Sequence, residues 1–174
     1  MNLWKNLTAW DGDTNGAKIT TLRAIIEIPL GSIIKYELSP TGDTFTAVRE
    51  MNKRYKYIYN YGSIPGTLGG DNDPLDVIVI YPEPISTGTV LNCKVVGVVK
   101  TIDKGEQDDK ILAVPYFYKP KRLRKWLKKI IRYLNHYKYP DQEGTYITEL
   151  LGPEKAVELI NQAIINFKEN VNEI

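Results

Sequence analysis

Residues 71–80 read Asp-Asn-Asp-Pro-Leu-Asp-Val-Ile-Val-Ile, so three carboxylates within six residues lead directly into an uninterrupted apolar run. The apolar run, residues 77–80, predicts a buried strand. Carboxylates this close repel one another, and they raise each other's pKa unless cations or hydrogen-bond donors hold them ionised. Oxygen ligands of this kind suit magnesium, calcium or manganese. The stretch therefore predicts a strand preceded by either a divalent-cation loop or a solvated turn of Asp, Asn and Pro.

One familiar acidic loop is excluded by its spacing. An EF-hand calcium loop requires Gly at its sixth position and Glu at its twelfth. Counted from Asp71, those two positions hold Asp76 and Pro82. The acidic stretch is therefore not an EF-hand.

The composition limits the class of protein. A chain of 174 residues suits one domain, which we expect to span residues 1–174 and to bury a core without disulfide or metal support. The net charge is +2, but residues 119–132 carry eight Lys or Arg and no acid, so the remainder carries −6. The near-neutral average therefore conceals one strongly basic segment in an acidic chain.

The scarcity of cysteine and histidine limits the chemistry. Cys93 is the only cysteine and lies in an apolar run, which is typical of a small buried hydrophobe in a reducing compartment. With His136 as the single histidine, neither a closed zinc site nor a Cys/His nucleophile pair can be assembled in the usual way. Residues 1–17 lack a continuous apolar core, so we expect no signal peptide, no membrane span and a cytoplasmic location.

Short strand-like runs dominate the first two thirds of the chain and helical patterns the last third. The expected strands are residues 23–28, 33–38, 45–49, 55–61, 77–81, 90–102 and 111–114, separated by Gly and Pro turn signals. Apolar residues of helical period from Leu123 to Leu134 predict one helix, which should lie on the sheet. A second helix should begin at Pro153, with Glu154 in its first turn. Short, closely spaced strands favour a barrel or a sandwich.

Several charged residues share strand faces. Strand alternation places Lys35 and Glu37 on one side of their strand, Arg49 lies on the next strand, and Glu27 lies within a mostly apolar strand. Each alone is explained by an exposed charge or a cross-strand ion pair. A second acidic cluster, Asp103, Asp108 and Asp109, falls in a turn that could equally be a solvated hairpin tip.

Two further patterns raise a nucleic-acid hypothesis. Tyr55, Tyr57, Tyr59 and Tyr61 recur at period two, so an extended strand would place four phenols on one face. Such a row could stack bases, although aromatic residues in strands more often pack. The basic segment 119–132 could bind a polyanion, or it could be the solvated face of an amphipathic helix.

The residues above occur in an order that resembles the soluble inorganic pyrophosphatases of the β-barrel family (family I). The resemblance rests on Ile26-Glu27-Ile28-Pro29, Ile34-Lys35-Tyr36-Glu37, Arg49, Asn60-Tyr61-Gly62, Ile64-Pro65-Gly66-Thr67, residues 71–76, residues 103–110, Ala113-Val114-Pro115 and His136-Tyr137-Lys138. It implies a mainly β fold with flanking helices (α+β): a closed five-stranded OB-like β-barrel with two main α-helices. It also implies Mg²⁺-dependent hydrolysis of pyrophosphate to two phosphates, with several Mg²⁺ per site, Mn²⁺ as a substitute, and a homo-oligomer.

The resemblance implies a role for each matched residue. Asp73 matches the general base that takes the proton of the attacking water. The metal-binding positions are Asp71, Asp76, Asp103 and Asp108, with Glu27 and Glu37 supporting outer metals through water. The phosphate-binding and cavity positions are Lys35, Arg49, Tyr61, Lys110, Tyr137 and Lys138. The family role agrees with the chemistry, because a compact polyanion needs cations, a deprotonated water and a stabilised leaving phosphate.

The chain departs from the family pattern at Lys104, where an acid is usual, and in residues 115–136, which are shorter and more basic. Two other functions therefore stay open beside hydrolysis. One is a β-barrel module for single-stranded nucleic acid, which the acidic clusters disfavour because carboxylates repel phosphate. The other is a degenerate relative that binds pyrophosphate without cleaving it.

Overall fold

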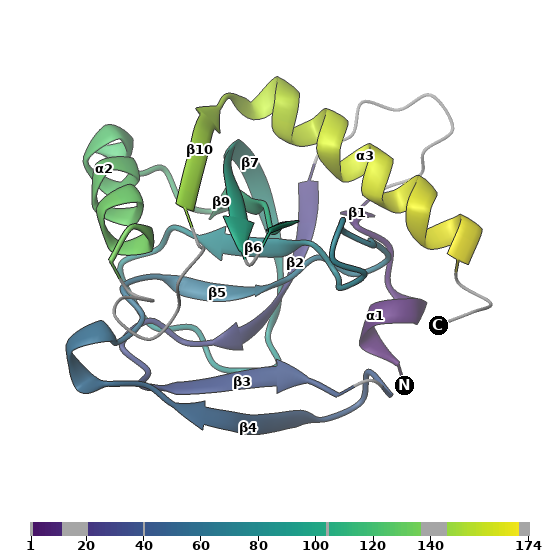
Figure 1. The fold of residues 1–174 in the computed structure, drawn as a ribbon, viewed down its shortest axis with the longest axis horizontal. Helices are drawn as coiled ribbons and strands as arrows, with labels where there is room; N and C mark the ends of the chain where they lie inside the picture. Colours follow the sequence, from purple (N-terminus) through teal and green to yellow (C-terminus); the bar gives the residue numbers. More distant parts are fainter. Residues whose placement is uncertain (1, 12–20, 40, 104, 137–145, 171–174) are drawn as a thin grey trace.

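The computed structural model describes residues 2–11, 21–39, 41–103, 105–136 and 146–170. Its helices are α1 (Leu3–Asn6), α2 (Leu123–Leu134) and α3 (Pro153–Asn170), with a 3₁₀ turn, η1, at Lys53–Tyr55. Its strands are β1 (Trp10–Asp11), β2 (Thr21–Ile28), β3 (Ile34–Leu38), β4 (Phe45–Glu50), β5 (Asn60–Ser63), β6 (Asp76–Val79), β7 (Val90–Asp103), β8 (Glu106–Gln107), β9 (Lys110–Pro115) and β10 (Tyr146–Leu151). Figure 1 shows the strands gathered centrally, with α2 and α3 on different sides of them.

Five strands pair in a closed ring. The order is β2-β5-β6-β9-β7, and a further pairing between β7 and β2 completes the circle. The long strand β7 makes closure possible, because its first residues pair with β2 while later residues pair with β9 and β10. A register shift between Val95 and Gly97 interrupts its pairing with β9. The ring agrees with the predicted mainly β, OB-like class.

Strand β6 is buried on both faces, which explains why residues 77–80 are apolar without alternation. Val77 and Val79 of β6 belong to one core cluster, together with Ala156 and Ile160 of α3. Ile78 and Ile80 belong to a second cluster, together with Ile130 of α2. Successive residues of a strand point to opposite faces, so α3 and α2 cover opposite faces of the same strands.

Both predicted helices are confirmed. Helix α2 buries Ile130 and Leu134, while its basic residues are exposed; these are Arg124, Lys125, Lys128, Lys129 and Arg132. Helix α3 begins at Pro153, carries Glu154 in its first turn and buries Ala156, Ile160, Ala163 and Phe167. Cys93 is fully buried in the core, as expected, and burial raises the pKa of its thiol to about 12. No helix in the described residues is long and apolar enough to cross a membrane.

The predicted strand over residues 55–61 is wrong in its first half. The 3₁₀ turn ends at Tyr55, and β5 begins only at Asn60. The backbone N–H of Tyr57 donates to Ser32 O, and the Tyr57 carbonyl accepts from Gly31 N. Tyr57 is therefore bonded to the turn at residues 31–32 and not to a neighbouring strand. Tyr57 and Tyr59 are 4 % and 1 % exposed, and their rings pack together with Tyr61. These tyrosines are therefore packing residues and offer no open stacking platform.

Candidate active site

A cavity of about 840 Å³ is lined by residues of the ring strands and of the β3–β4 hairpin. Eleven of the thirteen site residues expected from the sequence line it; these are Glu27, Lys35, Glu37, Arg49, Tyr61, Asp71, Asp73, Asp76, Asp103, Asp108 and Lys110. They come from β2, β3, β4, β5, β6, β7 and β9, and from the loops that precede β6 and β9. The other two, Tyr137 and Lys138, lie outside the described residues, as does Lys104. Residues far apart in the chain therefore share one cavity.

The acidic loop, residues 71–76, is shaped by its own hydrogen bonds. Asp71 Oδ1 accepts from Asp73 N at 3.1 Å, and Gly69 N donates to Asp73 O at 2.7 Å. Asn72 adopts a left-handed backbone with φ of 64°, a conformation that Asn tolerates better than most residues. The turn chemistry expected of this sequence is thus present, and it presents the carboxylates to the cavity.

The carboxylates of this loop are perturbed in the same direction. Partial burial raises the pKa of Asp71 above its usual value; the hydrogen bond from the Asp73 backbone partly offsets this effect, and the charge of Asp76 adds to it. Partial burial and the charges of Asp71 and Asp76 likewise raise the pKa of Asp73. A raised pKa makes a carboxylate a stronger base, which is the property that a general base near neutral pH requires.

A lysine joins the two acidic clusters. Strands β6 and β9 are parallel, and their register places Asp76 beside Lys110. The Lys110 ammonium forms ion pairs with both Asp76 and Asp108. Burial alone would lower the pKa of Lys110, but the two carboxylates outweigh that effect and raise it. Lys110 therefore stays charged and supplies a cation at the centre of the acidic wall.

The donor set fits a hard divalent cation. Asp71, Asp76 and Asp108 offer only oxygen ligands, which magnesium and manganese prefer. Among the described residues, no three His, Cys, Asp or Glu side chains are already gathered in a geometry that could hold a metal ion directly. The Lys110 ammonium, which pairs with both Asp76 and Asp108, is the positive charge that these two carboxylates contact in this structure.

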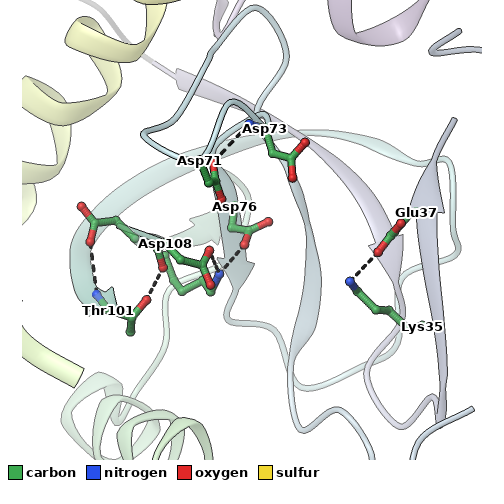
Figure 2. Close-up of polar contacts among 9 residues, drawn as sticks. Lys35, Glu37, Asp71, Asp73, Asp76, Thr101 and Asp108 are labelled. Carbon is green, nitrogen blue, oxygen red and sulfur yellow. Dashed lines mark hydrogen bonds and ion pairs between the residues drawn. The ribbon is translucent and has the colours of Figure 1, made fainter. Parts of the chain in front are cut away.

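The opposite wall carries cations. Lys35 and Arg49 are register partners on β3 and β4, and both line the cavity. Lys35 forms an ion pair with Glu37, which confirms that these two side chains lie on one face of β3. Figure 2 shows this pair on the hairpin, apart from the aspartate cluster. The cavity thus has an acidic wall and a mixed, partly basic wall, an arrangement suited to a metal-bound anion.

Glu27 lies deep in the site. Its side chain accepts a hydrogen bond from Ser63 Oγ at 2.7 Å, and the residue is 9 % exposed. Burial, only partly offset by this hydrogen bond, raises the pKa of Glu27 to about 8. The carboxyl group is therefore largely protonated at neutral pH without a nearby added cation.

Nine cavity residues were missing from the expected site; these are Trp4, Leu38, Ser39, Val48, Tyr57, Ser63, Asn72, Pro74 and Glu106. Tyr57 shares the period-two pattern of Tyr61 and could have been found from it, whereas nothing in the sequence singles out Ser63. Asp109 of the second acidic cluster has a structural role, since its carboxylate accepts from Thr101 N at 3.1 Å and Gln107 Nε2 at 2.6 Å. In the second acidic cluster, Asp103 and Asp108 therefore line the cavity, whereas Asp109 bonds residues of the segment that joins β7 to β9.

Comparison with known proteins identifies the family. The family model for inorganic pyrophosphatase matches residues 24–168. The chain belongs to the inorganic pyrophosphatase family. It is 34 % identical over 155 residues to soluble inorganic pyrophosphatase 1 of Arabidopsis thaliana, covering 84 % of this chain and 73 % of the relative. It is 35 % identical over 156 residues to the Aquifex pyrophilus inorganic pyrophosphatase, covering 83 % and 88 %.

Solved structures of this family share the fold. The Neisseria gonorrhoeae inorganic pyrophosphatase superposes with a TM-score of 0.80 and 31 % identity, covering 94 % of this chain and 97 % of that one. The Thermus thermophilus inorganic pyrophosphatase has a TM-score of 0.82 and 26 % identity, covering 97 % and 99 %. The family assignment and the buried tyrosines together disfavour the nucleic-acid module.

Proposed function

We propose that this pyrophosphatase family member hydrolyses inorganic pyrophosphate to two phosphates with the aid of divalent cations, Mg²⁺ first and Mn²⁺ as a substitute. The observation that carries the proposal is the convergence of Asp71, Asp73, Asp76 and Asp108 with Lys110 in one cavity. Pyrophosphate is a compact polyanion, so a site for it needs bridging cations on the acidic wall and positive side chains for the remaining oxygens.

The acidic wall would hold several cations. Asp71, Asp76 and Asp108 are the direct ligands in this proposal, Asp103 joins them, and Glu27 and Glu37 act through water. Bound divalent ions would neutralise phosphate oxygens and lower the pKa of a coordinated water. Cations would also favour the ionised form of Glu27, whose pKa burial otherwise raises to about 8.

The chain's own groups carry the proton transfer and the leaving phosphate. Asp73 accepts a proton from the attacking water as the oxygen–phosphorus bond forms and the bridging oxygen–phosphorus bond breaks. Lys35, Arg49 and Lys110 stabilise the negative charge that accumulates on the departing phosphate. Tyr61 contributes a phenol to the cavity, and Tyr137 and Lys138 complete the phosphate contacts in the proposal. A cytoplasmic location, a homo-oligomer and a single domain over residues 1–174 stay predictions.

The test is phosphate release from pyrophosphate in the presence of Mg²⁺. We expect turnover by the unaltered protein and a fall in kcat of about 100-fold or more for Asp73→Asn, because general-base catalysis contributes at least that much. Asp43→Asn is the matched control, since Asp43 is an exposed carboxylate that bonds only local Ser and Thr hydroxyls. Absence of turnover in the unaltered protein would refute hydrolysis, and pyrophosphate binding without turnover would support the degenerate alternative.

A further inference from the structure

The backbone immediately before the acidic loop is bonded to both terminal helices. Trp4 Nε1 of α1 donates to Thr67 O at 3.0 Å. Leu68 N donates to Ala163 O of α3 at 2.9 Å, and Asn166 Nδ2 of α3 donates to Leu68 O at 3.4 Å. Three polar groups of two successive residues are therefore held from outside the ring, three residues before Asp71.

A small separate core also holds Leu68 against the two terminal helices. Trp4, Leu68 and Phe167 form a buried cluster apart from the two main cores, with the Trp4 and Phe167 rings 5.5 Å apart. Figure 1 shows α1 beside the C-terminal end of α3. Helix α1 has four residues, too few to be stable alone, so its place depends on this cluster. The N- and C-terminal segments thus form one support under Leu68.

Hydrogen bonds and apolar packing together hold the acidic loop against α3. A cavity of about 180 Å³ lies between them, lined by Gly69, Gly70 and Asp71 on the loop side and by Gln162 and Asn166 on α3. Side chains that face this cavity make fewer packing contacts, so the Asn166 hydrogen bond at its edge adds a constraint that packing does not supply there. Gln162 Nε2 donates to Asn166 Oδ1 at 3.0 Å, which fixes the Asn166 amide with its N–H groups directed to Leu68.

The loop transmits a displacement of Leu68 to the carboxylates. Thr67 Oγ donates to Ile64 O at 2.6 Å and accepts from Leu75 N at 3.0 Å, which closes the base of the loop. Gly69 N then bonds Asp73 O, and Asp73 N bonds Asp71 Oδ1. A movement of the Leu68 backbone is therefore expected to change the distance between the carboxylates of Asp71 and Asp76, which follow Leu68 in the same loop.

We propose that Asn166, which lies outside the active-site cavity, and Trp4, which lines the edge of that cavity away from the proposed ligands, are positioning residues that set the divalent-cation affinity of the acidic loop through its backbone. The inference rests on the proposed role of Asp71 and Asp76 as cation ligands. Neither Asn166 nor Trp4 needs to touch the cation. They act by holding the Thr67 and Leu68 carbonyls, and thereby the geometry in which the carboxylate oxygens meet the ion.

The experiment measures Mg²⁺ binding without substrate, by titration calorimetry on chelator-treated protein. Asn166→Leu keeps the side-chain size and removes the amide. Asn161→Leu is the matched control on the same helix, because Asn161 is also hydrogen-bonded through its amide: Asn161 Oδ1 accepts from Trp10 Nε1 at 3.0 Å. This bond joins α3 to β1 and not to the acidic loop. We expect Mg²⁺ binding about 10-fold weaker in Asn166→Leu, the lower end for lost outer-shell partners of a metal site, and unchanged in Asn161→Leu.

A second pair of variants makes smaller changes that keep the core packed, so that a change in Mg²⁺ affinity can be told from a loss of folding. Trp4→Phe removes the indole N–H but keeps a ring in the small core, and Trp10→Phe removes the corresponding N–H that bonds Asn161. We expect weaker Mg²⁺ binding only in Trp4→Phe, and pyrophosphate turnover by Trp4→Phe and Asn166→Leu that recovers when Mg²⁺ is raised. A purely structural role would lower thermal stability in all four variants without a difference in Mg²⁺ affinity.

The outcomes separate this inference from the proposed function. Equal Mg²⁺ affinity in the unaltered protein, Asn166→Leu and Trp4→Phe would overturn the positioning role and leave the hydrolytic function standing. Absence of Mg²⁺ binding by the unaltered protein would overturn the ligand assignment, and the positioning role with it.

Discussion

Replacing Lys110 by Met should destabilise the metal-free protein far more than the Mg²⁺-bound protein. The Lys110 side chain is 5 % exposed, and its partners Asp76 and Asp108 are 25 % and 16 % exposed. Removing the ammonium leaves two partly buried carboxylates without a positive charge between them. Breaking a buried pair costs 3–5 kcal/mol in general, and the partial exposure of the carboxylates places this case at about 3 kcal/mol.

The loss is large enough to measure by thermal unfolding. About 3 kcal/mol corresponds to a fall in Tm of roughly 6–12 °C for a chain of this size. In saturating Mg²⁺ the bound cation replaces the missing charge and stabilises the folded state by mass action, so the Tm deficit should shrink by at least half. The assay is circular dichroism melting of both proteins near neutral pH, once with chelator and once with Mg²⁺.

Lys100→Met is the matched control for the Lys110 variant. Lys100 Nζ lies 3.7 Å from Asp109 Oδ2, but Lys100 is 32 % exposed and Asp109 keeps its bonds to Thr101 and Gln107. Its removal should cost less, and the cost should be the same with and without Mg²⁺. A Lys110→Met deficit that Mg²⁺ leaves unchanged, or no deficit in chelator, would refute the reasoning that Lys110 stands in for the cation.

Two further outcomes are expected. Because burial raises the pKa of Glu27 to about 8 from an unfolded value of 4.5, its contribution to stability is present below that unfolded pKa and is lost as pH rises towards 8. Chelator-treated Glu27→Gln should therefore lack part of the decline in unfolding free energy between those pH values, and parallel pH profiles of the two proteins would contradict this. Gly62→Ala should cost more than about 3 kcal/mol, because a Cβ there would lie 1.8 Å from Ile25 O of the paired strand. Gly70→Ala, whose Cβ would be 3.5 Å from its nearest neighbour, is the control, and equal denaturant midpoints would contradict the clash.

The predictions that succeeded rest on short-range patterns. The helical period of residues 123–134 specified α2, and Pro153 with Glu154 specified the start of α3. The uninterrupted apolar run after Asp76 specified a strand, and the structure shows that this strand, β6, is covered on both faces. Alternation alone put Lys35 and Glu37 on one face of β3. These features follow from side-chain direction within one element, which the local sequence contains.

The predictions that failed concern segments whose backbone N–H and C=O groups find their hydrogen-bond partners in distant parts of the chain. The alternating tyrosines favoured a strand over residues 55–61, but the turn at Gly31 and Ser32 took the hydrogen-bonding groups of Tyr57. Strands β1 and β8 have two residues each, and β10 is a largely exposed partner of β7 whose apolar residues do not alternate with polar ones, so none carries a pattern that would reveal it. Each of these segments is extended because it pairs with a longer strand, β1 with β2 and both β8 and β10 with β7.

By itself, the sequence determined that the chain has an acidic loop leading into a buried strand, cations on neighbouring strands and two amphipathic helices. Only the tertiary structure decided which of these groups meet. The parallel register of β6 and β9 brought Lys110 to Asp76, and the packing of α3 brought Asn166 to Leu68. These contacts join residues 34 and 98 positions apart, so their partners are chosen by sheet register and helix docking and not by local propensity.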